Sequence, residues 1–167
     1  MGIKSILKNL EKSQEFRKWH QKNRDTYFSY AFNIPQEMHD TWQIGYYNSK
    51  KDKVTTFVVD GKKIEIKPEE EVFKREESKV NEIELKKIKV DIDGAISEAD
   101  SFQQKNFPND KSIKTIAILQ NISQFGNVWN ITYITQAFNT LNMKIDAASG
   151  RVLEHNFASI FSFKQKE

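Results

Sequence analysis

The side chains best suited to catalysis or metal binding are few and scattered in this chain of 167 residues. Its three histidines, His20, His39 and His155, are predicted to lie on a helix, in a loop and on the last strand. There is no cysteine, so thiolate chemistry and disulfides are excluded and the ligand spacing of a zinc site is missing. Enzymatic chemistry requires nucleophile, base or metal ligands that converge on one point. We therefore expect a protein that is not an enzyme, with no catalytic residue, metal ligand or cofactor.

Two motifs could suggest a ligand, and each has a simpler structural explanation. The stretch 91–94, Asp-Ile-Asp-Gly, is similar to the start of a calcium loop, but Ala95 stands at the third acidic position and no glutamate follows at the twelfth. Capping of a helix start is the better interpretation. His39 and Asp40 could form a pair, although a loop histidine beside an acidic residue usually has no functional role. The six glycines form no phosphate-binding loop, which argues against nucleotide binding.

The charge pattern indicates solvated surfaces. Lys and Arg number 26 against 23 Asp and Glu, so the net charge of +3 is not that of a polycation and we do not expect a nucleic-acid partner. The basic residues crowd one segment near the start: Lys4, Lys8, Lys12, Arg17, Lys18, Lys22 and Arg24.

Charged residues interrupt every apolar run of the N-terminus, and no run reaches membrane-spanning length. We expect a cytoplasmic protein without a membrane span, unless a leader or anchor has been removed.

The elements that would position any site begin with a helical segment. From residue 3 to about residue 23 there is no proline or internal glycine, and Lys, Glu, Gln and Leu are frequent. The apolar stripe changes face near Ser13. Either Ser13 caps a second helix that carries Phe16 and Trp19 inward, or one helix uses its first half for a partner. The second alternative would give a contact surface or homodimer interface made of Ile3, Ile6, Leu7 and Leu10, although packing within the chain explains them more simply.

Four strands are expected next, over residues 27–34, 40–48, 53–59 and 62–66, because aromatic and β-branched residues alternate with polar ones. Between the last two strands, Asp60-Gly61 predicts a tight type I′ turn, in which both central residues need positive φ. Residues 68–81 are charged and poorly patterned, and we interpret them as a connector with one helical turn after Pro68. This connector ends a first domain, residues 1–81, and a second domain covers residues 82–167.

The second half starts with a helix whose apolar stripe ends before Pro108. A strand over residues 113–122 leads into a hairpin in which two sets of apolar residues alternate with polar ones: Trp129, Ile131 and Tyr133, then Leu141, Met143 and Ile145. A turn with Asp146, Ser149 and Gly150 follows, and the chain then becomes extended again. We interpret these turn residues, like Asp60 and Gly61, as structural.

The two halves resemble each other in sequence. Trp42 aligns with Trp129, Tyr46 with Tyr133 and, after a shift of about one residue, Asp60 with Asp146. The tryptophan strand followed by Ile-Asp-Ala-x-Ser-Gly-Arg-Val, residues 145–152, resembles the end of a PepSY domain, a small helix-plus-sheet module found in propeptides of secreted metallopeptidases. The resemblance covers the second half, and the internal repeat extends it to the first; together they imply an α+β fold of two similar units, each with a helix packed on one face of an antiparallel meander.

Function follows only as a hypothesis. The PepSY resemblance implies a regulatory role towards peptidases, and exposed edges of antiparallel sheets can accept a peptide strand. We therefore expect a non-enzymatic protein that binds a polypeptide. The alternative is a small-molecule binder with a pocket between the two units, lined by aromatic residues: Trp42, Tyr46, Tyr47, Trp129 and Tyr133. Packing in the core explains the same alternating aromatics better.

Overall fold

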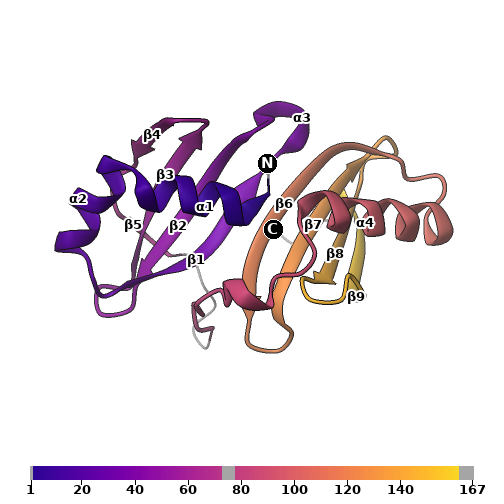
Figure 1. Cartoon of the computed structure of the whole chain (residues 1–167). Coiled ribbons are helices and arrows are strands. Elements are labelled where there is room, and N and C mark those ends of the chain that lie inside the picture. Colours follow the sequence, from indigo (N-terminus) through magenta and orange to yellow (C-terminus); the bar gives the residue numbers. More distant parts are fainter. Residues whose placement is uncertain (1, 73–77, 162–167) are drawn as a thin grey trace.

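A computed structural model describes residues 2–72 and 78–161, which form an α+β fold around one antiparallel sheet of nine strands (Figure 1). The helical elements are α1 Ile3–Lys12, α2 Gln14–Lys22, α3 Pro35–Met38, the 3-10 turn η1 Leu85–Lys87 and α4 Ile92–Asn106. The strands are β1 Thr26–Asn33, β2 Thr41–Asn48, β3 Lys53–Asp60, β4 Lys63–Ile66, β5 Glu70–Glu71, β6 Ser112–Ile122, β7 Gly126–Thr135, β8 Asn139–Asp146 and β9 Val152–Ser159.

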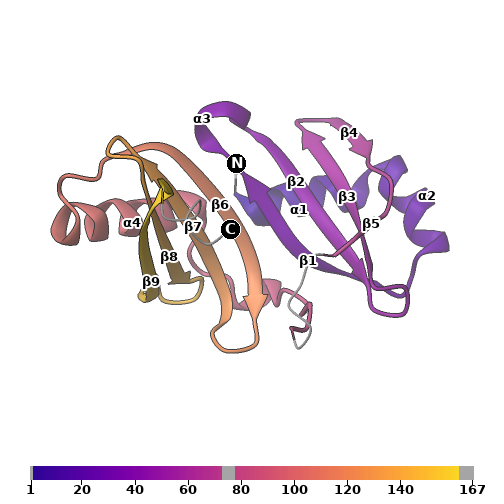
Figure 2. The same ribbon diagram turned by 180° about the vertical axis from the view of Figure 1, so that it is seen from behind.

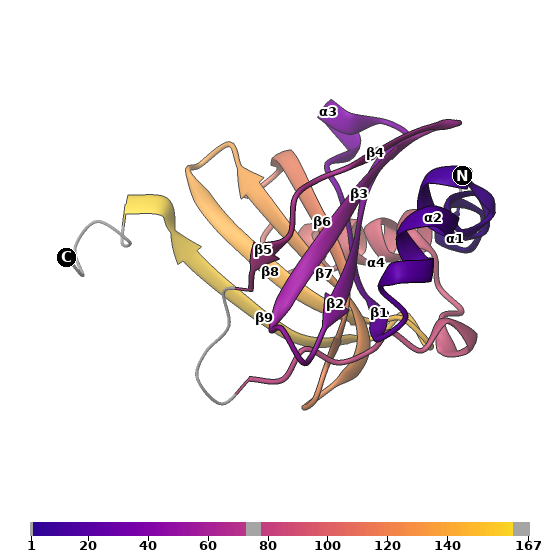
Figure 3. The ribbon, with the colours of Figure 1, turned by 90° about the vertical axis from the view of Figure 1, so that its left-hand side faces the viewer.

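Both halves of the chain contribute to the same sheet. Its order is β4-β3-β2-β1-β6-β7-β8-β9, with β5 paired to β3 outside this path. The two halves meet where β1 and β6 run antiparallel from the pair Tyr30 and Gln120 to the pair Asn33 and Ala117. As a result, β4 and β9 lie at opposite edges, and α1, α2 and α4 all cover one face (Figures 1 and 3). No helix of the described residues covers the opposite face, and in Figure 2, which shows that face, α1, α2 and α4 lie behind the sheet.

The first helical segment is divided at Ser13, as one of the two sequence interpretations predicted. Ser13 has extended backbone angles, φ −67° and ψ 152°, and its Oγ accepts a hydrogen bond from the Phe16 backbone N at 3.1 Å. The cap therefore starts a second helix that buries Phe16. The apolar face of α1 is also buried in the core, with exposed fractions of 0, 3, 2 and 0% for Ile3, Ile6, Leu7 and Leu10. These four side chains are not accessible to a partner.

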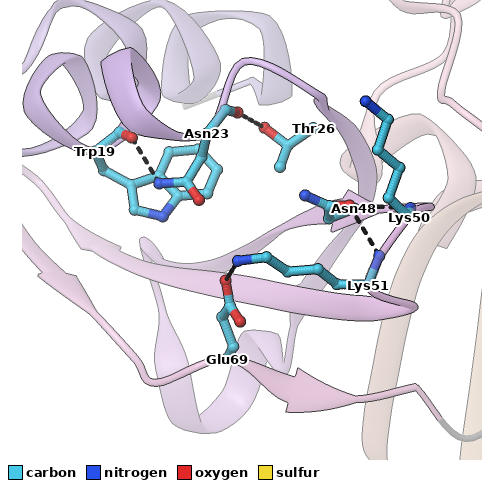
Figure 4. Close-up of polar contacts among 7 residues, drawn as sticks. All are labelled: Trp19, Asn23, Thr26, Asn48, Lys50, Lys51 and Glu69. Atoms are coloured by element: carbon cyan, nitrogen blue, oxygen red, sulfur yellow. Dashed lines mark hydrogen bonds and ion pairs between the residues drawn. The ribbon is translucent and has the colours of Figure 1, made fainter.

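The first half contains two hairpins with different turns. In the turn after β2, the Asn48 side chain accepts bonds from the backbone N atoms of Lys50 and Lys51 at 3.0 and 3.1 Å (Figure 4). The prediction of a type I′ turn at Asp60-Gly61, between β3 and β4, is wrong. The two turn residues are Gly61 and Lys62, and only Gly61 has positive φ, at 58°. That pattern is typical of a type II′ turn, for which glycine at the first central position is sufficient.

The connector begins with a strand instead of the predicted helical turn. Glu70 and Glu71 pair with Val54 and Lys53, so the chain after Pro68 is extended. The contact between Lys51 Nζ and Glu69 Oε1 at 3.4 Å joins this segment to the hairpin (Figure 4). The rest of the predicted connector includes residues 73–77, which lie outside the described part of the chain.

The predicted helix of the second half is confirmed as α4, and its cap also contacts α1. Asp91 Oδ1 accepts a hydrogen bond from the Ile92 backbone N at 2.9 Å, so capping explains the stretch that is similar to a calcium loop. The same oxygen accepts a bond from the Ile3 backbone N at 3.2 Å. Asp91 therefore joins the starts of α1 and α4 over one face of the sheet.

The core includes Trp42 and Trp129 in contact with each other. Trp129 is fully buried, Trp42 is 2% exposed, and their ring centroids lie 6.3 Å apart. Trp42 belongs to β2 and Trp129 to β7, so the contact spans the two central strands, whose side chains here include the fully buried Ala31 and Ala117. The indole Nε1 of Trp129 donates to the Val90 backbone O at 2.8 Å. This ring thus packs against the first half and also bonds to the segment before α4.

The turn between β8 and β9 is held by the residues that the sequence marked as structural. Asp146 Oδ2 accepts a bond from Ser149 Oγ at 2.6 Å, and Asp146 O accepts one from Gly150 N at 2.8 Å. Gly150 has φ of 81°, and an added Cβ would approach other atoms no closer than 3.6 Å. Backbone strain, and not a clash, is therefore the cost of a side chain at this position.

Gly150→Ala is expected to lower the free energy of unfolding by about 1 kcal/mol or more. Gly150→Asn should cost less, because asparagine tolerates the left-handed region better than alanine. Thermal unfolding of the two variants and the unsubstituted protein tests this, and an alanine variant that melts at the unchanged temperature would contradict it.

Two buried tyrosines predict a loss of stability at alkaline pH. Burial, together with a neighbouring carboxylate, raises the pKa of Tyr46 near Glu11 and of Tyr133 near Asp100 above the usual value of 10.0. Above about pH 10 the unfolded phenols lose protons that the folded ones keep, so the unfolded state becomes relatively more stable as pH rises. Urea midpoints at pH 9 and 11 should differ more for the unsubstituted protein than for Tyr133→Phe. Equal differences would contradict the expectation.

Candidate functional site

The two edges of the sheet differ in length and charge. β4 has four residues, two of which are the charged Lys63 and Glu65, and this composition is typical of an edge protected against further strand pairing. β9 has eight residues with a single acidic side chain, Glu154. Within the described residues, no strand pairs with the outer side of β9. The β9 edge is therefore the more open of the two.

Two backbone hydrogen bonds establish which backbone groups of β9 point outward. The Ala147 N donates to Asn127 O at 3.0 Å, and Ile160 N donates to Phe138 O at 2.9 Å. In an antiparallel ladder, successive residues direct their N–H and C=O alternately to the two sides. The first bond turns Ala147 towards β7, so Asn142, an odd number of residues away, faces β9, where it pairs with Asn156. The second bond gives the same phase: Asn156 faces β8, while His155 and Phe157 direct their N–H and C=O groups away from it. His155 and Phe157 thus present two donors and two acceptors along the edge.

Aromatic side chains accompany these outward groups on the helix-covered face. Phe157 stacks on Phe107 with ring centroids 4.6 Å apart and an interplanar angle of 13°, and His155 lies 5.0 Å from Phe102. Six large apolar side chains of the described residues are well exposed, and four of them lie on β9 or beside its end: Phe138, Leu153, Phe157 and Phe161. Apolar exposure therefore concentrates at the edge that also lacks a partner strand.

The other side of β9 borders a polar trough on the helix-free face. The trough has a volume of about 910 Å³ and its lining includes Asn130, Asn142, Lys144, Glu154 and Asn156. Asn142 Nδ2 donates to Asn130 Oδ1 at 2.5 Å, and Lys144 Nζ donates to Asn142 Oδ1 at 3.3 Å. Lys144 also lies 3.9 Å from Glu154 at the edge. Hydrogen bonds thus connect Asn130, Asn142 and Lys144 inside the trough, and this row of polar side chains ends at Glu154 on β9.

The aromatic residues predicted to line a pocket between the two units lie in the interior instead. Exposed fractions are 2, 5, 0 and 1% for Trp42, Tyr46, Trp129 and Tyr133. Tyr47 is 4% exposed, and its ring meets that of Tyr27 edge-on at 5.6 Å. These side chains are packed in the interior, so their surfaces are not available to a ligand, and none of the five lines the trough.

The histidines are distributed over separate elements. His20 stacks on Phe16 within α2, His39 follows α3, and His155 lies on β9. In residues 2–72 and 78–161, no group of three or more histidine, aspartate and glutamate residues is arranged to hold a metal ion. No helix of these residues is long and apolar enough to span a membrane.

The β9 edge was not predicted from the sequence. Its residues gave one usable signal, a strand of eight residues with a single acidic side chain. That signal gains meaning only when the strand is known to end the sheet. The strand order depends on pairing between distant segments, such as β1 with β6, which periodicity does not report.

Comparison with known proteins supports the fold. No protein-family model matches the chain, and no curated protein matches it in sequence. The chain is similar to a crystal structure, at 1.85 Å resolution, of a putative lipoprotein from Clostridium difficile 630. The TM-score is 0.56, and the match covers 86% of this chain and 90% of that one. Sequence identity is 13%, so the similarity concerns the fold alone.

Proposed function

We propose that this protein is a non-enzymatic, polypeptide-binding protein that accepts an extended peptide as an added strand at β9. The observation that carries the proposal is the open β9 edge, with outward main-chain groups at His155 and Phe157 and exposed aromatic rings beside them. Strand addition supplies affinity through main-chain hydrogen bonds, while side chains that alternate between the two faces supply specificity. Each of these elements is available at this edge.

The proposal includes an architecture of two PepSY-like units, residues 1–81 and 82–167. The order of elements supports it, because a helical segment precedes β1 to β4 and α4 precedes β6 to β9. Trp42 and Trp129 lie on the second strand of each series. On this interpretation β4 and β9 are equivalent edges, of which charge protects only the first.

A short peptide fits the β9 edge better than a second copy of the chain. The register shift between Lys144 and Ile145 interrupts regular pairing near Leu153, so the regular edge is limited to residues 154–159. A strand of that length covers about 20 Å. One such strand pair is a small contact compared with the roughly 1,600 Å² that a stable protein interface buries.

Selection from a displayed library of random ten-residue peptides tests the function. We expect enriched peptides that bind the full chain and share alternating apolar and polar positions, as an added strand requires. Light scattering of the protein alone shows whether the chain forms a dimer, the state in which β9 would pair with a second copy. A library without enriched binders, or a stable dimer that occupies β9, would contradict the proposal.

A further inference from the structure

The β9 edge offers a different surface to each face of an added strand. Side chains of an added strand that lie opposite His155 and Phe157 would share the helix-covered face with the Phe107 and Phe102 rings. Side chains at the intervening positions would lie on the helix-free face, beside Glu154 and Asn156 at the border of the trough. The aromatic side favours large apolar residues, and the trough side favours polar ones.

Charge adds a further distinction on the trough side. Glu154 is the one charged residue of β9, and 46% of its side chain is exposed. Its neighbour Lys144, on the inner strand, is only 20% exposed and also donates to Asn142. Because Lys144 approaches the Glu154 carboxylate from the inner side, the outer side of this carboxylate is available to a cation on an added strand. Opposite charges on adjacent strands attract, and like charges directly opposite each other repel.

We infer that Glu154 selects peptides with a lysine or arginine on the face that meets the trough, between apolar residues on the other face. The inference rests on the proposed strand addition at β9 and names the class of peptide that the same edge takes. The ligand is thus an amphipathic extended segment with basic residues at alternate positions. Glu154 acts as a specificity-determining residue, while the main-chain groups of the edge contribute binding that does not depend on sequence.

A charge exchange tests the inference. The probes are two fluorescein-labelled peptides of ten alternating valine and threonine residues, in which two central threonines are replaced by lysine in one and by glutamate in the other. The unsubstituted protein should bind the lysine peptide roughly three- to tenfold more tightly. Glu154→Lys should reverse the preference, and Glu154→Gln should bind the two peptides about equally.

Glu65→Lys provides the matched control, because it makes the same charge change on β4 at the opposite edge. This variant should keep the lysine preference of the unsubstituted protein. If both peptides bind and neither Glu154 variant changes their ratio, the inference about Glu154 is overturned while strand addition stands. If neither these peptides nor any from the random library bind, the proposed function fails as well.

Discussion

Trp129→Ala is expected to lower the free energy of unfolding by about 3–5 kcal/mol, a large part of the total for a domain of this size. The ring is fully buried and packs 6.3 Å from Trp42 across the two central strands. Its removal leaves a cavity where the first and second halves of the chain meet. It also removes the donor that satisfies the Val90 backbone O just before α4.

Urea unfolding followed by far-UV circular dichroism measures this effect without depending on tryptophan fluorescence. Ile113→Ala is the matched control, because Ile113 is also a large apolar residue on a strand of the second half but is 56% exposed. Its cost should stay below about 1 kcal/mol. Similar losses for both variants would contradict the central place of Trp129 in the core.

His155→Pro is expected to weaken binding of a library-selected peptide at least about tenfold while the protein stays folded. Proline removes the outward N–H of residue 155, and its ring would occupy the space next to the edge. The pairing of β8 with β9 should survive, because proline is tolerated on edge strands where the missing N–H faces solvent. Fluorescence anisotropy measures binding, and circular dichroism checks the fold.

Two further variants separate the causes of any loss. His155→Ala removes the ring that contacts Phe102 but keeps the N–H, and it should retain most of the affinity. Ile66→Pro places proline at an outward position of β4, where the bond from Lys67 N to Thr56 O sets the phase, and it should leave binding unchanged. Full affinity in His155→Pro would show that the peptide does not use this edge.

Local structure was well predicted from the sequence where one pattern dominated. The strands from β1 to β4 and β6 to β9, the α4 helix and the division at Ser13 all agree with the periodicity and capping signals. The turn types were less well predicted. Asp60-Gly61 is compatible with a type I′ or a type II′ hairpin, and the structure has the type II′ pattern, with a single positive φ. The extended stretch at Glu70 depends on a partner strand at Lys53, which a local pattern does not reveal.

The candidate site was less predictable, because it depends on what remains uncovered after folding. Alternating aromatics such as Trp42 and Tyr133 have the same pattern whether they form a core or a pocket, and burial decides between the two. Conversely, Phe157 appears in the sequence as an ordinary strand residue. It becomes part of a candidate site only because β9 ends the sheet and α4 brings Phe107 beside it.

Amide hydrogen exchange, followed by NMR on the uniformly labelled protein with and without a library-selected peptide, tests strand addition at β9 most directly. The amides of His155 and Phe157 point away from β8 and should exchange quickly in the free protein. With the peptide bound, both should become markedly slower, while the outward amide of Ile66 on β4 should not change. Protection that appears elsewhere, with His155 and Phe157 unaffected, would contradict the account.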